Sequence, residues 1–147
     1  MKITRIEPFL LRLPVVTEAC DGTQDDLLMR IETDEGIRAW GEVDTSPDVS
    51  SICGLTEARK VAVIAQDAHV RRVLRAFKTG ILLAATSQLI ATMPNTELLE
   101  YSLAESPIRK DLLTEPLYVL DGYVKVSDKS VWGIEVNPDV VTRDRVA

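Results

Sequence analysis

Near residue 54 the hydrophobic pattern of the chain changes from strand-like alternation to helical spacing, and this change limits the possible folds more than any other feature. From Lys2 to Leu13 apolar and polar residues alternate, which predicts a half-buried strand. Residues 27–33 and 37–43 continue the alternation on either side of a turn in which Gly36 can adopt a positive φ. The first 43 residues are therefore predicted to form an antiparallel meander.

After a polar boundary at residues 44–53, helical spacing replaces the alternation. Residues 56–68 repeat apolar side chains at helical intervals, and residues 80–92 are apolar nearly all round, as in a helix buried on several sides. The segments 70–77 and 98–103 have the composition of short strands. This order predicts about two βα units.

The last thirty residues contain the strongest turn signal of the chain. Asp121-Gly122 lies between two apolar segments and predicts a hairpin over residues 117–126. Residues 132–136 predict one more strand, and Asn137-Pro138 predicts the start of a helix with proline at its first position. The whole pattern is that of an α+β protein.

Composition limits the partners and the location of the chain. Its 147 residues are 46% hydrophobic and 27% charged, as expected for one globular domain, and the formal net charge is −6. An acidic chain argues against a nucleic-acid or anionic-membrane surface, because both require clustered Lys and Arg. Cys20 and Cys53 lack zinc-ligand spacing, no signal peptide opens the chain, and the apolar stretch 81–93 is too short to span a bilayer. We therefore expect a cytoplasmic protein with no membrane partner.

Short motifs occur in a fixed order along nearly the whole chain, and their order is more specific than any of them alone. With these motifs the chain resembles the mandelate racemase and muconate lactonizing enzyme group of the enolase superfamily. The motifs are Met1–Glu7, Leu28–Gly36, Trp40-Gly-Glu42, Gly54–Ala58, Lys78–Ile81, Leu99-Glu-Tyr101, Leu113–Pro116, Asp121-Gly-Tyr123 and Gly133-Ile-Glu135.

This resemblance implies an architecture. Relatives place an α+β cap, built from the N-terminal segment and the extreme C-terminal strands, over a modified βα barrel that needs about 250 residues. We therefore expect an α+β fold with an antiparallel cap-type sheet from both chain ends and a partial βα barrel segment. The expected division is residues 1–53 for the cap meander and linker, 54–116 for the partial barrel, and 117–147 for C-terminal strands returning to the cap. Most of a barrel is expected to be missing by internal deletion.

The resemblance also implies a chemistry. Relatives abstract a proton α to a carboxylate of a small-molecule substrate and hold the enediolate on Mg²⁺, because so weak an acid needs its developing charge neutralised. Three carboxylates from successive strands bind the metal, and a Lys-x-Lys motif often supplies the base. This chain contains no Lys-x-Lys, and no spaced run of Asp and Glu lies between Gly41 and Gly54. We expect no metal ligands and no cofactor in this chain, whereas intact relatives use Mg²⁺.

Two carboxylates can be placed on the catalytic positions of the relatives. Glu100 matches a carboxyl at the end of the last barrel strand, which donates a hydrogen bond to the enediolate when it is protonated. Asp48 matches the carboxylate of a His-Asp dyad, although the same string also fits the end of the N-terminal match. The histidine of that dyad falls at Arg75, and arginine cannot act as a base. The alternatives are a surface carboxylate for Glu100 and a turn residue for Asp48.

The loop 15–25 matches a cap loop that closes over substrate, with Cys20, Asp21 and Gly22 near its tip; the alternative is a plain connection. Three hypotheses for the whole chain follow. The first is a catalytically silent relative of magnesium-dependent racemases and acid-sugar dehydratases. The second is a non-catalytic assembly module, in which helix 80–92 loses its cover and binds another copy or a full-length homologue. The third is a chain that barely folds, because partial barrels leave strand edges unpaired.

Overall fold

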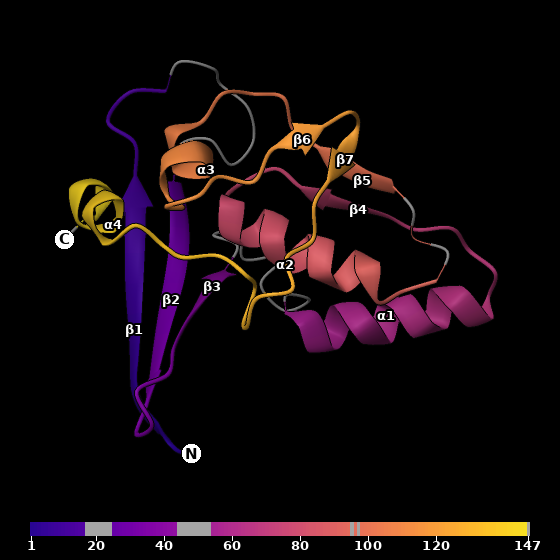
Figure 1. The fold of residues 1–147 in the computed structure, drawn as a ribbon, viewed down its shortest axis with the longest axis horizontal. Coiled ribbons are helices and arrows are strands. Elements are labelled where there is room, and N and C mark those ends of the chain that lie inside the picture. The colour runs from indigo at the N-terminus through magenta and orange to yellow at the C-terminus, as the bar shows by residue number, and fades with distance from the viewer. Residues whose placement is uncertain (17–24, 44–53, 95, 97, 147) are drawn as a thin grey trace.

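The structure, a computed structural model, describes residues 1–16, 25–43, 54–94, 96 and 98–146. Figure 1 shows the β1–β3 sheet at one side of the molecule, α4 against β1, and α1 and α2 side by side. The elements in chain order are β1 (Ile3–Arg12), β2 (Asp25–Thr33), β3 (Arg38–Val43), α1 (Leu55–Asp67), β4 (Val73–Ala76), α2 (Gly80–Ala91), β5 (Leu98–Tyr101), α3 (Pro107–Asp111), β6 (Val119–Leu120), β7 (Tyr123–Val124) and α4 (Pro138–Asp144).

The N-terminal sheet has the predicted form. Strands β1, β2 and β3 pair antiparallel in sequence order, and Phe9 lies opposite Leu28, which in turn lies opposite Glu42. Gly36 has a φ of 79° in the turn between β2 and β3, a conformation that glycine adopts without steric cost. The predicted meander of the first 43 residues is confirmed.

The middle of the chain has the order α1–β4–α2–β5, and β4 and β5 pair in parallel. Helix α2 begins where the chain supplies a cap, because the Thr79 hydroxyl accepts hydrogen bonds from the backbone N–H groups of Ile81 and Leu82, both at 3.2 Å. Helix α2 packs against β4. Together these elements give the predicted βα arrangement, and the expected α+β class is confirmed.

The hydrophobic core joins the N-terminal sheet to helices that come much later in the chain. Its members come from β1, β2, α2, the α3 region and α4: Phe9, Leu11, Leu13, Leu28, Ile81, Ile108, Leu112, Leu113, Val140 and Val141. Helix α3 was not predicted from the sequence, although Ser106-Pro107 places proline at its first position. Helix α4 begins where predicted, with the Asn137 side chain accepting a hydrogen bond from the Asp139 N–H at 3.0 Å.

The predicted hairpin is present as β6 and β7. Asp121 and Gly122 between them have φ values of 51° and 82°, as a two-residue type I′ turn requires. This pair forms a sheet of its own, and the chain end returns to β1 through an isolated bridge between Leu11 and Arg145. The N-terminal sheet therefore takes its strands from the first 43 residues, and the C-terminal end adds α4 and this bridge.

The prediction of a strand at residues 132–136 is wrong. Val131 and Gly133 have φ values of 61° and 69°, and residues in this left-handed region cannot continue a strand. Only Val136 forms an isolated bridge, to Leu113. The Trp132 indole N–H donates instead to the Trp40 carbonyl at 3.3 Å, which ties this turn to β3.

Helix α2 was expected to lose its cover, and this expectation is wrong. Its buried residues are Gly80, Ile81, Leu83, Ala84, Thr86, Ser87 and Leu89. The exposed apolar side chains lie elsewhere, among them Val61, Val63 and Ile64 on α1. Among the helices in the described part of the chain, none combines the length and the apolar character needed to cross a bilayer.

Candidate functional site

The structure brings together two of the positions that the resemblance marked as catalytic. Arg75 on β4 and Glu100 on β5 are register partners in the parallel pair. The Nε atom of Arg75 lies 3.1 Å from Oε1 of Glu100. The Arg75 guanidinium also stacks over the Phe77 ring, with its carbon 4.4 Å from the ring centroid. The Arg75 side chain therefore makes two contacts, one with Glu100 and one with Phe77.

The arrangement of this pair differs from the one that the resemblance implies for these positions. A carboxylate paired with arginine only accepts hydrogen bonds, whereas the role implied for Glu100 requires a protonated carboxyl that donates one. The pair also lies in solvent, because the side chains of Arg75 and Glu100 are 58% and 57% exposed. Preorganised stabilisation of an enediolate depends on a site from which water is excluded.

The other predicted site residues cannot be placed. Asp48 lies outside the described residues, as do Cys20, Asp21 and Gly22 of the predicted substrate loop. Their assignments remain predictions from the resemblance.

A buried polar cluster, which we call the sheet–helix cluster, was not predicted from the sequence. It consists of Asp26 on β2, Glu42 on β3, and Lys78 and Thr79 just before α2. The Nζ atom of Lys78 lies 4.0 Å from Oδ1 of Asp26, and these side chains are only 8% and 1% exposed. The Thr79 hydroxyl, which caps α2, donates a hydrogen bond to Oε2 of Glu42.

The sheet–helix cluster connects parts of the chain that are far apart in sequence. The motifs Trp40-Gly-Glu42 and Lys78–Ile81 contributed to the resemblance, and nothing in their local pattern shows that they meet. With Lys78 and Asp26 both buried, loss of either partner would leave an uncompensated buried charge, which is strongly destabilising. The cluster therefore fixes the position of the N-terminal sheet relative to α2.

A cavity of about 380 Å³ lies beside the sheet–helix cluster. Glu42 and Lys78 are the charged side chains of its lining, and Phe77, Ile81 and Trp132 contribute apolar walls. A cavity of this size is within the range of small-ligand sites. The charged side chains that line the cavity already make contacts inside the protein: Glu42 accepts a hydrogen bond from Thr79, and Lys78 pairs with Asp26.

The described residues do not fit a bound magnesium ion. Mg²⁺ requires near-octahedral oxygen ligands and usually takes carboxylates from the protein. In residues 1–16, 25–43, 54–94, 96 and 98–146, no group of three or more His, Cys, Asp or Glu side chains is arranged to hold a metal ion. Asp26 and Glu42 are near the buried Lys78 ammonium group, whose positive charge opposes a second cation.

Comparison with known proteins establishes the family. Residues 42–140, more than half of the chain, match the family described as Enolase C-terminal domain-like, and the chain therefore belongs to this family. Over 115 residues the chain is 33% identical to the D-galactarolactone cycloisomerase of Agrobacterium fabrum, a match that covers 72% of this chain and 30% of the cycloisomerase.

Solved structures agree with this assignment. An enolase of the mandelate racemase subgroup from Agrobacterium tumefaciens, solved with a succinimide residue, sodium and phosphate, matches with a TM-score of 0.53 and 28% identity, covering 61% of this chain and 25% of that one. A structure described as an L-alanine-DL-glutamate epimerase from Burkholderia xenovorans, bound to magnesium and fumarate, shares the fold with a TM-score of 0.57 at 16% identity, covering 62% and 23%. The expected membership of the enolase superfamily is confirmed.

The chain spans less than a third of the length of each of these relatives. This short coverage is consistent with the internal deletion expected from the order of the motifs.

Proposed function

We propose that this chain is a catalytically silent relative of the enolase-superfamily racemases and cycloisomerases, which does not abstract α-protons by itself. The observation that supports this most directly is the ion pair between Arg75 and Glu100. By the resemblance, the histidine of the relatives' dyad falls at Arg75, and a guanidinium group does not serve as a general base. The position of the acid is occupied by a carboxylate that faces this cation.

The surroundings of the pair support the same function. Removing a proton next to a carboxylate requires a base, a divalent cation and donors arranged around the developing enediolate. The described residues offer no carboxylate set for the cation. The 57% exposure of Glu100 places the remaining acid in water, where a hydrogen bond contributes little to transition-state stabilisation. We also propose a cytoplasmic location for the chain.

The test is α-proton exchange in deuterated water, followed by proton NMR with magnesium chloride and a panel of 2-hydroxy acids and sugar acids. The wild-type chain is expected to give the same rate as buffer. Arg75→His is also expected to remain silent, because a restored imidazole still lacks a metal. Exchange by the wild type that Glu100→Gln abolishes would overturn the proposal. Exchange gained by Arg75→His would contradict the expectation that a metal is also required, and would leave the missing base as the reason for the silence of the wild type. Isothermal titration with magnesium chloride is expected to show no binding heat.

A second function is favoured by a separate observation. Large apolar side chains are exposed on the N-terminal sheet, including Ile3, Ile6 and Leu10 on β1. Exposed apolar surface that is contiguous marks an interaction site in many proteins. A silent chain of this kind can act as an assembly module that associates with itself or with a full-length homologue.

A further inference from the structure

The two faces of the β1–β2–β3 sheet differ in their chemistry. Side chains alternate between faces along a strand, and directly opposed residues of neighbouring strands share a face. One face, the charged face, carries the pairs Arg5 with Glu32, Glu7 with Arg30 and Arg30 with Trp40 before it enters the core at Phe9. The other, which we call the apolar face, carries apolar residues on β1, β2 and β3, among them Ile6, Pro8, Leu10, Leu27, Met29, Ile31, Ala39 and Gly41.

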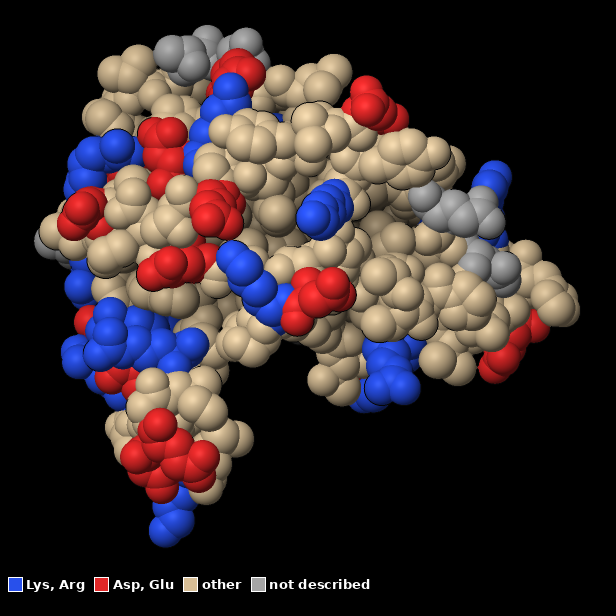
Figure 2. Space-filling view, viewed as in Figure 1, with Lys and Arg blue, Asp and Glu red and all other residues tan. Residues whose placement is uncertain are grey.

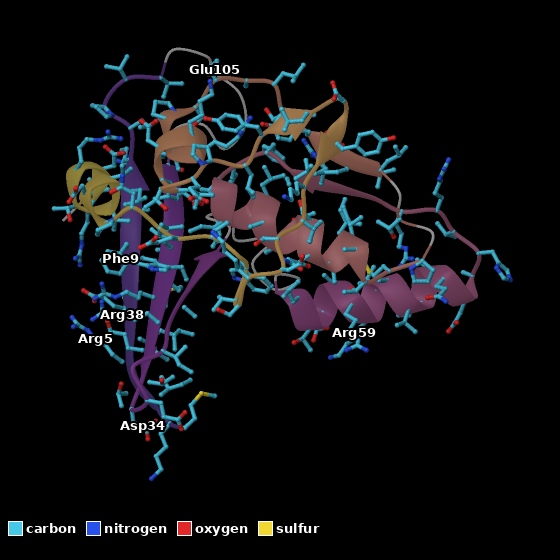
Figure 3. All side chains as sticks on the ribbon, in the orientation of Figure 1. Arg5, Phe9, Asp34, Arg38, Arg59 and Glu105 are labelled. Carbon is cyan, nitrogen blue, oxygen red and sulfur yellow. The ribbon has the colours of Figure 1, made fainter. Side chains whose placement is uncertain are left out.

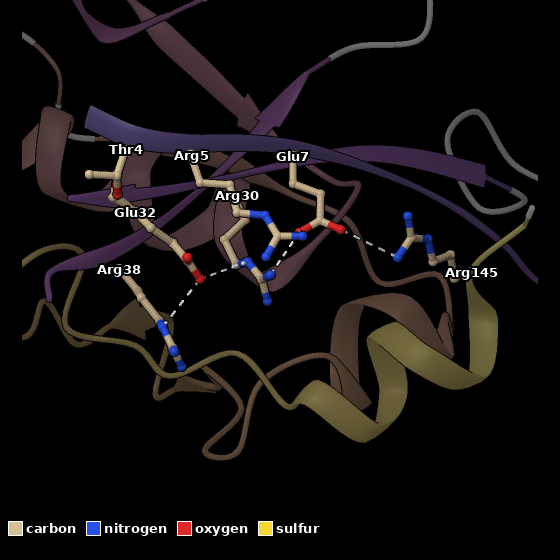
Figure 4. Close-up of polar contacts among 7 residues, drawn as sticks. All are labelled: Thr4, Arg5, Glu7, Arg30, Glu32, Arg38 and Arg145. Atoms are coloured by element: carbon tan, nitrogen blue, oxygen red, sulfur yellow. Dashed lines mark hydrogen bonds and ion pairs between the residues drawn. The ribbon is translucent and has the colours of Figure 1, made fainter. Parts of the chain in front are cut away.

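The charged face is satisfied within the chain. Glu7 is contacted by Arg30 at 2.7 Å, by Arg5 at 3.0 Å and by Arg145 at 3.6 Å, and Glu32 is contacted by Arg30 and Arg38 at 3.4 and 3.3 Å (Figure 4). Figure 3 shows Arg5, Phe9 and Arg38 along this sheet, with Asp34 at its tip. Lys and Arg side chains gather over this part of the surface in Figure 2. Two copies of a surface with many arginines would repel each other, because like charges would face each other.

The side chains of the apolar face are exposed or half-buried and are mostly uncharged. Ile6 is 57% exposed, and Pro8 and Leu10 are also exposed, whereas Met29 and Ile31 on the central strand are half-buried. Charged residues of this face occur only at one end, where Arg12 and Asp25 lie 3.6 Å apart and neutralise each other. The middle of the face is therefore an uncharged apolar strip.

We propose that this apolar face is a self-association surface, on which two copies of the chain pack their N-terminal sheets face to face. In a two-fold dimer each residue near the axis meets its own equivalent. Apolar residues such as Ile6 tolerate this arrangement, whereas equal charges would repel each other. The apolar face meets this condition, and the charged face does not.

The β1 edge of the sheet is partly protected, which favours association through the face over association through this edge. Strand β1 has an irregular register between Ile3 and Arg5 and carries Pro8, and both features hinder the addition of another strand. Near the other end of β1, the backbone N–H of Val146 donates to the Leu10 carbonyl at 2.8 Å. Part of the edge is therefore occupied by the C-terminal segment of the same chain.

The size of the face predicts a weak dimer. At about 3.3 Å per residue and 4.8 Å between strands, three strands of ten, nine and six residues present roughly 400 Å² to a partner. Stable complexes bury about 800 Å² on each partner, and smaller contacts are transient. We therefore expect a monomer–dimer equilibrium with a dissociation constant of about 1–100 μM. Self-association through this face is independent of whether the chain catalyses a reaction.

The test is sedimentation velocity of the wild-type chain from about 1 to 500 μM, a range that brackets the expected dissociation constant. The wild type is expected to shift from monomer to dimer across this range. Ile6→Lys is expected to weaken the dimer more than about 100-fold, because the symmetry of the interface introduces the charge twice. The matched control is Ile64→Lys on α1, which changes an apolar side chain that is 68% exposed on another surface and should leave the dimer unchanged.

Far-UV circular dichroism at low concentration shows whether each variant remains folded. If Ile6→Lys does not fold, Ile6→Thr serves instead, because it keeps the β-branched shape and is expected to weaken the dimer at least about tenfold. A wild type that stays monomeric throughout would overturn the proposal. Dissociation by Ile64→Lys with an unchanged Ile6→Lys dimer would overturn it as well. The same holds if the chain associates only after the purified cycloisomerase relative is added.

Discussion

Gly80 gives the sharpest test of how α2 packs. It is the first residue of α2 and is buried, and a Cβ atom added there would lie 2.6 Å from Cδ1 and 2.8 Å from Cγ of Leu113. The same Cβ would lie 3.2 Å from the carbonyl oxygen of Arg109 in α3. Leu113 is itself buried in the core. Gly80→Ala must therefore displace the Leu113 side chain, and the short distance to the Arg109 carbonyl also presses α3 away from α2.

The expected magnitude follows from two opposing effects. Overpacking of a filled core costs about 1–3 kcal/mol. Replacing glycine in a helix returns about 0.5–1 kcal/mol, because alanine restricts the unfolded chain. We expect Gly80→Ala to lower the free energy of unfolding by about 1–2 kcal/mol, which for a chain of this size lowers the melting temperature by about 2–8 °C.

Urea denaturation followed by circular dichroism measures this change. Gly41→Ala is the matched control, because no atom lies within 4 Å of the Cβ position at Gly41. We expect the control to change stability by less than about 0.5 kcal/mol. If Gly80→Ala were as stable as the wild type, the close contact between α2 and Leu113 would be refuted.

Two further predictions concern charged side chains. The buried Arg109 donates hydrogen bonds to the carbonyls of Ser102 at 2.5 Å and Phe77 at 2.6 Å. Arg109→Lys cannot reach both carbonyls, so it should lower the free energy of unfolding, measured by urea denaturation, by about 2–3 kcal/mol. A loss below about 0.5 kcal/mol would show that these hydrogen bonds do not support the fold. Glu7→Gln should lower the free energy of unfolding by about 1–2 kcal/mol at low salt and by less at about 1 M NaCl, because three guanidinium groups lose their common carboxylate. The control Glu57→Gln, at the exposed pair with Lys60, should change this free energy little. Equal effects of the two variants would contradict the network around Glu7.

Some catalytic assignments could be made from the sequence, and others depend on segments that the structure does not describe. The resemblance placed the histidine of a dyad at Arg75 and a strand-end acid at Glu100, and these roles remain predictions. The register of β4 and β5 brings the two side chains to 3.1 Å. The assignments of Asp48 and of the loop containing Cys20, Asp21 and Gly22 stay predictions. The division into residues 1–53, 54–116 and 117–147 also remains a prediction.

The sequence by itself determined the local elements whose signals lie within a few residues. Alternation over the first 43 residues determined the meander, Asp121-Gly122 determined the hairpin, and Asn137-Pro138 determined the start of α4. Each signal acts through backbone preferences or through the nearest turn of the chain. Such patterns can be recognised without knowledge of any distant contact.

Tertiary structure alone decided the features that join distant segments. Helix α3 has only five residues, too few to show a helical period, and it is held by burial of Ile108 in the shared core. The turn at Val131 and Gly133 replaced an expected strand, and Trp132 bonds to the carbonyl of Trp40. The pairing of Lys78 with Asp26 joins residues more than fifty positions apart. A local pattern records side-chain preferences, whereas these contacts depend on which surfaces exclude water together after the chain has folded.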